Sequence, residues 1–233
     1  IPAPSTPANL PYRVEYITQP VDHLNGLTSN DTFSQRYLRE DSNFTKGGPI
    51  FAFTGAEGGD VPRFYGSYAA PIGLARRLGG MIIFMEMRFF GKSDTFNATA
   101  STCPDNLAQL CPSADRLGLL SLEQVLADYT QLLTTVLQSC GADCASSPVV
   151  AFGGSLAGTL AAMMRLTRPW LVDFAWSSSS PFFGTPAGIK PAASLSLHSR
   201  FADPVGSPRS DRLRGHAQHQ RVRMARADHD QLA

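Results

Sequence analysis

The sequence predicts an α/β domain with a largely parallel sheet at its centre. Two short segments, residues 49–54 and 81–85, are continuous apolar runs, which is typical of central strands covered on both faces. Residues 122–136 repeat apolar side chains at three- and four-residue spacing, which predicts an amphipathic helix. A third apolar run, residues 149–152, passes through two glycines directly into a helical pattern. Strands that alternate with helices in this order favour a parallel-centred α/β sheet.

The remaining elements are weaker in pattern but consistent with such a sheet. Residues 12–19 and 32–38 alternate apolar and polar side chains, so we expect two half-exposed strands that pair antiparallel. Residues 65–78 have a weak helical pattern that ends at two glycines. A helix that Pro169 stops precedes a last predicted strand at residues 171–177.

Composition divides the 233-residue chain into three parts. Residues 1–11 contain four prolines and are predicted to be an extended lead-in. Residues 12–182 hold all of the predicted strands and helices and are long enough for one sizeable domain. In residues 183–233 Ala, Pro, Ser and Arg dominate without any helical or strand period, so we expect an irregular, disordered basic tail. The abrupt change suggests the hypothesis that this tail is not the continuation with which the domain evolved, as after a frameshift or a mis-joined exon.

Overall composition argues against nucleic-acid and membrane partners. A net charge of +1 and a hydrophobic fraction of 43% describe an ordinary globular protein. The basic tail lacks the interleaved aromatic residues or amphipathic stripe that would support binding to nucleic acid or anionic lipid. No apolar run approaches the length of a membrane span. The chain begins at Ile1 without a signal-like segment, so we expect that an N-terminal signal has been removed.

Two features favour the secretory route. Acceptor sequons for N-glycosylation occur at Asn30, Asn43 and Asn97. The cysteines form two close pairs in turn-rich stretches, Cys103 with Cys111 and Cys140 with Cys144. Such pairs favour two local disulfides in an oxidising compartment, although three connectivities are formally open. Four reduced thiols are the alternative, and a metal site is disfavoured because no histidine lies among the cysteines.

Ser155 lies where the third apolar run turns into a helical pattern. A strand that turns sharply into a helix forces strained backbone angles on the residue at the turn and lifts its side chain above the sheet. Gly153 and Ala157 flank Ser155 at two residues on either side, which approaches the Gly-x-Ser-x-Gly nucleophile elbow of α/β-hydrolases. Gly158 follows directly and gives the turn further room. We therefore predict Ser155 as a catalytic nucleophile, the alternative being a glycine-rich turn with an incidental serine.

A glycine-rich loop follows the predicted strand at residues 49–54. In α/β-hydrolases the loop after the third strand supplies one backbone N–H to the oxyanion hole, and the residue after the nucleophile supplies another. This assigns one donor to the region of Gly55 and Ala56 and the second to Leu156. Glu57 is either a contact for a substrate amine or a solvated charge, and a flexible surface loop is the alternative for the whole segment.

Glu86 and Arg88 are charges attached to the apolar strand at residues 81–85. Charges in such a place are usually paired, and pairing would fix the following loop near Ser155. A surface salt bridge is the alternative. His23 stands alone in a predicted turn, where a histidine is more often structural than catalytic.

Six segments agree in order and spacing with one known family over roughly residues 12–182. They are residues 19–24, 32–37, 55–60, 86–93, 123–129 and 153–158. On these segments the chain resembles the lysosomal Pro-X carboxypeptidase and dipeptidyl peptidase II family of serine peptidases. The resemblance implies an α/β-hydrolase domain that cleaves short peptides next to proline through an acyl-enzyme on Ser155, without a cofactor. It also implies a homodimer, in a lysosome- or vacuole-like compartment or outside the cell.

The chain also departs from the family pattern. Leu156 and Ala157 replace the aromatic residue and the glycine that usually follow the serine. Phe89 and Phe90 stand where tyrosines are usual, and these changes concern substrate fit more than chemistry. In the family, the helical cap and the catalytic Asp and His lie far downstream of the nucleophile. The hydrolase domain is therefore predicted to be truncated after the strand at residues 171–177.

In α/β-hydrolases the triad follows the chain order Ser, acid, His. Asp203 followed by His216 or His219 has that order, but no predicted strand precedes either position to hold it. One hypothesis is a serine exopeptidase, either a carboxypeptidase or a dipeptidyl peptidase. A second is an inactive truncated fragment or pseudoenzyme without the triad Asp and His. A third, an α/β-hydrolase esterase, is weakened by the family-like segments outside the elbow.

Overall fold

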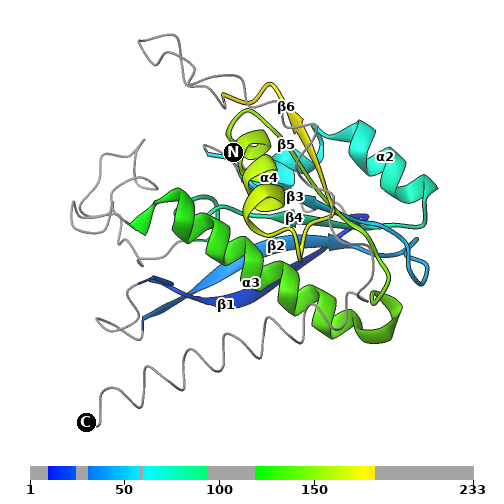
Figure 1. Cartoon of the computed structure of the whole chain (residues 1–233), viewed down its shortest axis with the longest axis horizontal. Helices are drawn as coiled ribbons and strands as arrows, with labels where there is room; N and C mark the ends of the chain where they lie inside the picture. The colour runs from blue at the N-terminus through cyan, green and yellow to red at the C-terminus, as the bar shows by residue number, and fades with distance from the viewer. Residues whose placement is uncertain (1–9, 25–30, 58–59, 94–118, 182–233) are drawn as a thin grey trace, which may run out of the picture.

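The computed structural model describes residues 10–24, 31–57, 60–93 and 119–181. These residues form one six-stranded mixed sheet with helices on both faces, the α/β arrangement that the sequence predicts (Figure 1). The predicted tail at residues 183–233 lies outside the described ranges, as does most of the lead-in.

The sheet has the strand order β1-β2-β4-β3-β5-β6. Its strands are β1 (Arg13–Pro20), β2 (Thr32–Glu40), β3 (Ile50–Phe53), β4 (Met81–Met85), β5 (Val149–Gly154) and β6 (Phe174–Ser178). β2 pairs antiparallel with β1 and β4, whereas β3 pairs in parallel with β4 and β5, and β5 with β6. β2 therefore runs against the other five strands, whose carboxyl ends meet at one edge. Ligands of open α/β sheets bind at this carboxyl edge.

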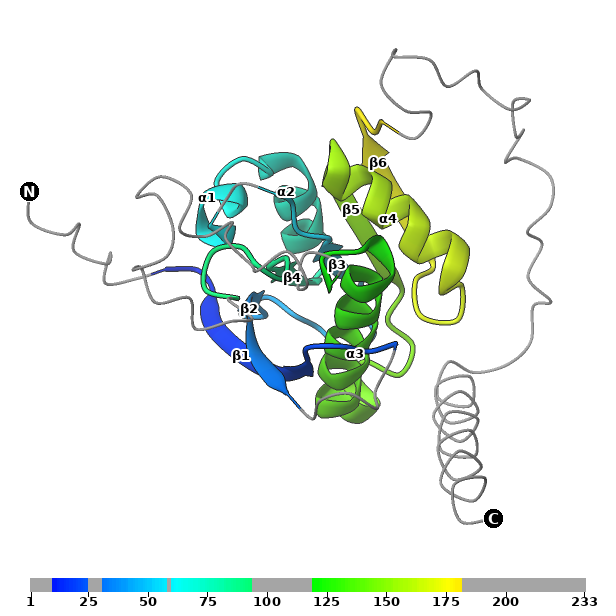
Figure 2. The same ribbon diagram turned by 90° about the vertical axis from the view of Figure 1, so that its left-hand side faces the viewer.

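Two layers of helices cover the sheet. The helices are α1 (Val61–Tyr65), α2 (Ala69–Arg77), α3 (Leu122–Cys140) and α4 (Leu156–Thr167), with a short 3₁₀ turn, η2 (Gly141–Asp143), after α3. α1 and α2 lie on one face, and α3 and α4 lie on the other (Figure 2). In β3, for example, Ala52 faces α3 and α4, whereas Phe51 and Phe53 face α1 and α2. Both faces are buried, which is why the central strands have continuous apolar sequences.

The structure differs from the sequence prediction in two places. Of the segment expected to be helical, residues 65–78, only Ala69–Arg77 form a helix, α2, and Tyr65 is the last residue of the separate helix α1, which the sequence pattern did not predict. Tyr68, at φ −114° and ψ 48°, precedes α2 and is not helical. The strand expected at residues 171–177 begins only at Phe174. Its first residues are instead buried in the turn after α4.

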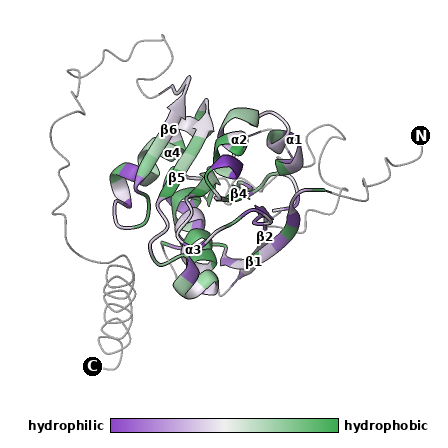
Figure 3. Cartoon of the chain, turned by 90° about the vertical axis from the view of Figure 1, so that its right-hand side faces the viewer, coloured by the Kyte–Doolittle hydropathy of each residue, from purple (hydrophilic) through white to green (hydrophobic). Residues whose placement is uncertain are grey.

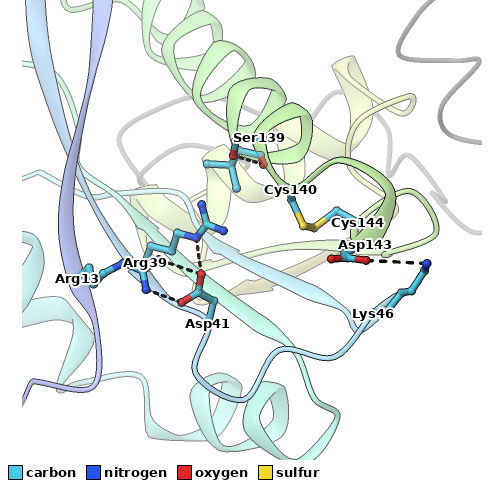
Figure 4. Close-up of a disulfide and its surroundings, with 9 residues drawn as sticks. Arg13, Arg39, Asp41, Lys46, Ser139, Cys140, Asp143 and Cys144 are labelled. Carbon is cyan, nitrogen blue, oxygen red and sulfur yellow. Dashed lines mark hydrogen bonds and ion pairs between the residues drawn. A yellow bond between two sulfur atoms is a disulfide. The ribbon is translucent and has the colours of Figure 1, made fainter.

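α3 is fixed at both of its ends. Ser121 caps its start, and the Ser121 Oγ accepts a hydrogen bond from the Gln124 N–H over 3.3 Å. At the other end, the Cys140–Cys144 disulfide ties the last turn of α3 to the end of η2 (Figure 4). The second predicted pair, Cys103 and Cys111, lies outside the described residues.

Within the described residues, β6 is an open edge of the sheet. It pairs with β5 on one side, and the side chains of Phe174 and Trp176 are 61% and 42% exposed. β5 and α4 beside it are mostly apolar, whereas hydrophilic residues occupy much of β1 and β2 (Figure 3). An uncharged edge strand with exposed apolar side chains is a place where a further strand or a partner would pair.

Candidate active site

Ser155 lies at the junction between β5 and α4. Its backbone adopts φ 56° and ψ −129°, a conformation that is rare for a residue with a Cβ and costs about 1–3 kcal/mol. Its side chain is exposed at the carboxyl edge of the sheet. The Ser155 N–H donates to the Ser178 carbonyl at the end of β6 over 3.0 Å, which holds the strained turn against the sheet. A serine raised on such a turn has the geometry of a nucleophile elbow.

Small residues allow α4 to start directly over β5. A Cβ atom at Gly153 would lie 2.5 Å from the carbonyl carbon of Ala157, in the first turn of α4. A Cβ atom at Gly158 would lie 3.0 Å from the Ser178 carbonyl oxygen. Ala157 fits where the usual pattern has glycine, because the missing side chain of Gly153 leaves room for its methyl group. The departure at Ala157 therefore leaves the elbow geometry intact.

The loop after β3 lies beside the elbow. β3 and β5 run in parallel, with Phe53 opposite Phe152. Gly55 and Ala56 therefore leave the sheet next to Ser155. The first turn of α4 starts at the same edge, and its N–H groups have no partner within their own helix. The two sources of N–H donors that the sequence predicts thus lie on one edge of the sheet.

Thr54 ties the start of this loop to α4, and Tyr129 packs beneath the loop from the core side. The Thr54 hydroxyl donates to the Ala157 carbonyl over 2.5 Å, which ties the end of β3 to the first turn of α4. Gly55 has φ +54°, and a Cβ atom there would lie 2.2 Å from the Tyr129 hydroxyl oxygen. Burial raises the pKa of the Tyr129 phenol well above its usual value, and two nearby carboxylates raise it further. The phenol therefore keeps its proton beneath the loop.

Glu86 is buried at the end of β4 and accepts hydrogen bonds from three segments. Arg36 of β2 makes a two-point contact with it, with Nη2 2.5 Å from Oε1 and Nε 3.2 Å from Oε2. The backbone N–H of Val61 at the start of α1 donates to Oε1 over 3.2 Å. The Lys92 N–H and the Ser93 hydroxyl donate to Oε2 over 2.8 Å and 2.9 Å. Glu86 thus joins β2, α1 and the loop after β4.

Arg88 belongs to a second buried cluster, which does not share the Glu86 carboxylate. Its guanidinium is fully buried and contacts both carboxylate oxygens of Asp128 in α3, over 2.7 Å and 2.9 Å. Its Nη1 donates to the carbonyls of Val21 and Leu119 over 2.8 Å and 2.9 Å. Because Glu86 and Arg88 are both buried, the surface salt bridge considered for them is wrong.

No histidine lies beside Ser155 within the described ranges. His23 is the one histidine that they include, and its Nε2 lies 2.7 Å from Asp128 Oδ1. Its ring is thus engaged by Asp128 of α3, and among the described residues no contact joins it to Ser155. The described part of the chain has no cluster of three or more His, Cys, Asp or Glu side chains placed to bind a metal ion. The predicted acid and base candidates lie outside the described residues: Asp203, His216 and His219.

Four polar side chains around the site were not singled out from the sequence: Thr54, Tyr68, Arg36 and Asp128. Arg36 and Asp128 are the partners of Glu86 and Arg88, from which they are 50 and 40 residues distant in the chain. A usable signal exists in the sequence, because Arg36 and Asp128 stand inside a predicted strand and a predicted helix. Buried charges on such elements need opposite charges elsewhere.

Sequence comparison places the chain among serine peptidases. The family model described as "Serine carboxypeptidase S28" matches residues 19–185. The lysosomal Pro-X carboxypeptidases of Homo sapiens and Pongo abelii are each 35% identical over 187 residues, which are 77% of this chain and 35% of theirs. A putative serine protease of Caenorhabditis elegans is 32% identical over 201 residues, 84% of this chain and 33% of that protein. The chain thus spans about a third of the length of these relatives.

Solved structures resemble the chain in fold. The match to a probable hydrolytic enzyme from Pseudomonas aeruginosa covers 72% of this chain and 41% of that protein, with 18% identity and a TM-score of 0.42. The match to a carboxyl esterase from Bacillus coagulans covers 70% of this chain and 43% of the esterase, with 12% identity and a TM-score of 0.43. With TM-scores below 0.5, these similarities carry no argument about this chain. On the match of residues 19–185 the chain belongs to the serine carboxypeptidase S28 family.

Proposed function

We propose that Ser155 is the nucleophile of a serine exopeptidase that cleaves short peptides next to proline. The left-handed backbone of Ser155 at the β5–α4 junction, with the loop after β3 beside it, is the observation that supports this most. The family match supports the peptidase class. The preference for proline rests on the human and Pongo abelii relatives, which are named Pro-X carboxypeptidases.

The proposed reaction is acyl transfer through an acyl-enzyme. Ser155 Oγ forms a bond to the carbonyl carbon, the carbonyl electron pair moves to oxygen, and the hydroxyl proton passes to a general base. The N–H groups of Leu156 and of the Gly55–Ala56 segment hold the oxyanion. Collapse re-forms the carbonyl and breaks the C–N bond, and the amine leaves with the proton from the base. Water then releases the acyl group from Ser155 by the same steps.

The buried charges are proposed to support the site rather than to react. The carboxylate of Glu86 and the guanidinium of Arg88 are hydrogen-bonded to other protein groups. Their proposed role is therefore to fix the carboxyl edge on which the loop after β3 rests. Glu57 differs from both, because its side chain is exposed on that loop. It is the proposed contact for the amino group of a short peptide.

A secretory location, in a lysosome-like compartment or outside the cell, is proposed with this function. The human and Pongo abelii relatives are lysosomal by name, and the Cys140–Cys144 disulfide suits an oxidising compartment. Asn43, the glycosylation acceptor within the described residues, is exposed in the turn after β2, where a glycan has room. None of the described helices is long and apolar enough to cross a membrane.

We expect the purified chain to cleave the bond after proline in a short Xaa-Pro-Xaa peptide faster than it hydrolyses a short-chain ester. Ser155→Ala removes the nucleophile and should lower the peptide turnover at least about 10³-fold. Ser139→Ala is the matched control, because the Ser139 hydroxyl only bonds the Val136 carbonyl near the end of α3. Product release by both variants and the parent chain, followed by chromatography, gives the rates.

Three outcomes separate the candidate functions. Equal turnover by the Ser155→Ala variant would exclude Ser155 as the nucleophile. Ester hydrolysis without peptide hydrolysis would favour the esterase. No turnover by the folded chain would favour an inactive fragment or pseudoenzyme.

A further inference from the structure

Tyr68 places its hydroxyl directly beside the residue that precedes the nucleophile. The Gly154 N–H donates to the Tyr68 hydroxyl oxygen over 3.0 Å. On the preceding rung of the ladder, the Thr54 N–H donates to the Phe152 carbonyl over 3.1 Å. In a parallel sheet the next acceptor for Gly154 would be a main-chain carbonyl of β3. β3 turns away at Gly55, and the Tyr68 hydroxyl takes that place.

The ring of Tyr68 is held by three phenylalanines of the central strands. Its centroid lies 4.7 Å from the ring of Phe53, 5.7 Å from that of Phe152 and 6.3 Å from that of Phe84. Tilted and edge-to-face contacts of this kind fix a ring in one orientation. The hydroxyl is therefore positioned before any substrate binds, as an electrostatic contribution to catalysis requires.

Unlike a backbone carbonyl, a hydroxyl in this place can donate a hydrogen bond as well as accept one. A tyrosine hydroxyl has two lone pairs and one proton, and the Gly154 N–H occupies one lone pair. Among the described residues, the Tyr68 hydroxyl makes this one hydrogen bond and no other. Its proton is thus available for donation at the carboxyl edge, beside Gly154, the residue that precedes Ser155.

We propose that Tyr68 donates this proton to the oxygen of the acyl group that Ser155 attacks, as a third donor beside the N–H groups of Leu156 and the Gly55–Ala56 segment. The proposal rests on the function proposed above, because it names a further group at the same site. Removal of one donor to an oxyanion typically lowers the rate about 10²–10³-fold. Tyr68 would then be a catalytic residue.

The first test compares two phosphorus reagents that differ at one atom. An alkyl fluorophosphonate presents a P=O oxygen to the donors, whereas its thio analogue presents a P=S sulfur, which accepts hydrogen bonds weakly. Tyr68→Phe should slow inactivation by the P=O reagent about 10²-fold and slow the P=S reagent much less. Tyr65→Phe is the matched control, because the Tyr65 hydroxyl bonds Glu40 and Arg76 away from Ser155. It should leave the ratio of the two rates unchanged.

A second variant separates donation from simple bracing of Gly154. A fluorinated tyrosine at position 68 has a more acidic phenol, and its phenolate still accepts the Gly154 N–H but has no proton to give. If Tyr68 donates, the fall in P=O inactivation at high pH should move to lower pH with the acidity of the phenol. This variant keeps the hydroxyl and remains informative if Tyr68→Phe does not fold.

The outcomes distinguish this proposal from the proposed function. If the parent chain reacts with neither reagent, the proposed function fails and this inference fails with it. If the parent chain reacts, but Tyr68→Phe slows both reagents equally, Tyr68 only braces the elbow and the inference alone is overturned. A pH profile that does not move with the fluorinated phenol overturns it as well.

Discussion

Asp128→Asn should lower the free energy of unfolding by about 3–5 kcal/mol, because it leaves the fully buried guanidinium of Arg88 without its counter-charge. Asparagine has nearly the same shape, so the change removes charge rather than volume. The Arg88 N–H groups that now face the Asp128 carboxylate would face a neutral amide, which matches only part of their donor pattern. The same change removes the carboxylate contact of His23.

A surface ion pair gives the matched control for this effect. Asp143, the last residue of η2, lies 3.9 Å from Lys46 and is largely exposed (Figure 4). Asp143→Asn should therefore change the free energy of unfolding by less than about 1 kcal/mol. Urea denaturation followed by circular dichroism measures both variants. Equal stability of the two variants would show that the Arg88–Asp128 pair does not hold β1, the loop after β4 and α3 together.

Gly153→Ala should both destabilise the chain and disable the elbow. The new Cβ atom would lie 2.5 Å from the Ala157 carbonyl carbon and 2.6 Å from its Cβ, so α4 has to move away from β5. Overpacking of this kind costs about 1–3 kcal/mol, and here the atoms in the way belong partly to the backbone. The displacement acts directly on Ser155, whose strained conformation depends on the close approach of strand and helix.

Gly73→Ala is the control with the same chemical change. No atom lies within 4 Å of a Cβ at Gly73, which is inside α2, so alanine there should stabilise the helix by about 1 kcal/mol. The midpoint temperature of thermal unfolding should therefore fall in the Gly153→Ala variant and rise in the Gly73→Ala variant. A Gly153→Ala variant with unchanged stability would contradict the close packing at the elbow.

The sheet and the elbow were predictable from the sequence because both depend on local pattern. Buried strands such as β3 and β4 are continuous apolar runs, and α3 has a regular apolar face with a serine cap. The turn at Ser155 is surrounded by small residues, and they are needed there for a steric reason that depends only on neighbouring segments. The break between α1 and α2 has a weaker signal, because Gly66 caps the end of α1 but Tyr68 itself is neither glycine nor proline.

The buried charge clusters and Tyr68 were not predictable in the same way. Glu86 and Arg88 stand two residues apart, yet they pair with Arg36 and Asp128 on different elements. Which charges meet depends on the order of strands in the sheet, and this order is not a local property. Tyr68 gains its position only because β3 leaves β5 at Gly55, so that a side chain from the α1–α2 junction completes the ladder.

Covalent labelling of Ser155 tests the central claim most directly. The folded parent chain, shown to unfold cooperatively, is treated with a fluorophosphonate, digested and analysed by mass spectrometry. We expect one phosphonyl adduct, on the peptide that contains Ser155, and no adduct in the Ser155→Ala variant. A folded parent chain without an adduct, or with the adduct at another serine, would contradict the assignment of Ser155 as an activated nucleophile.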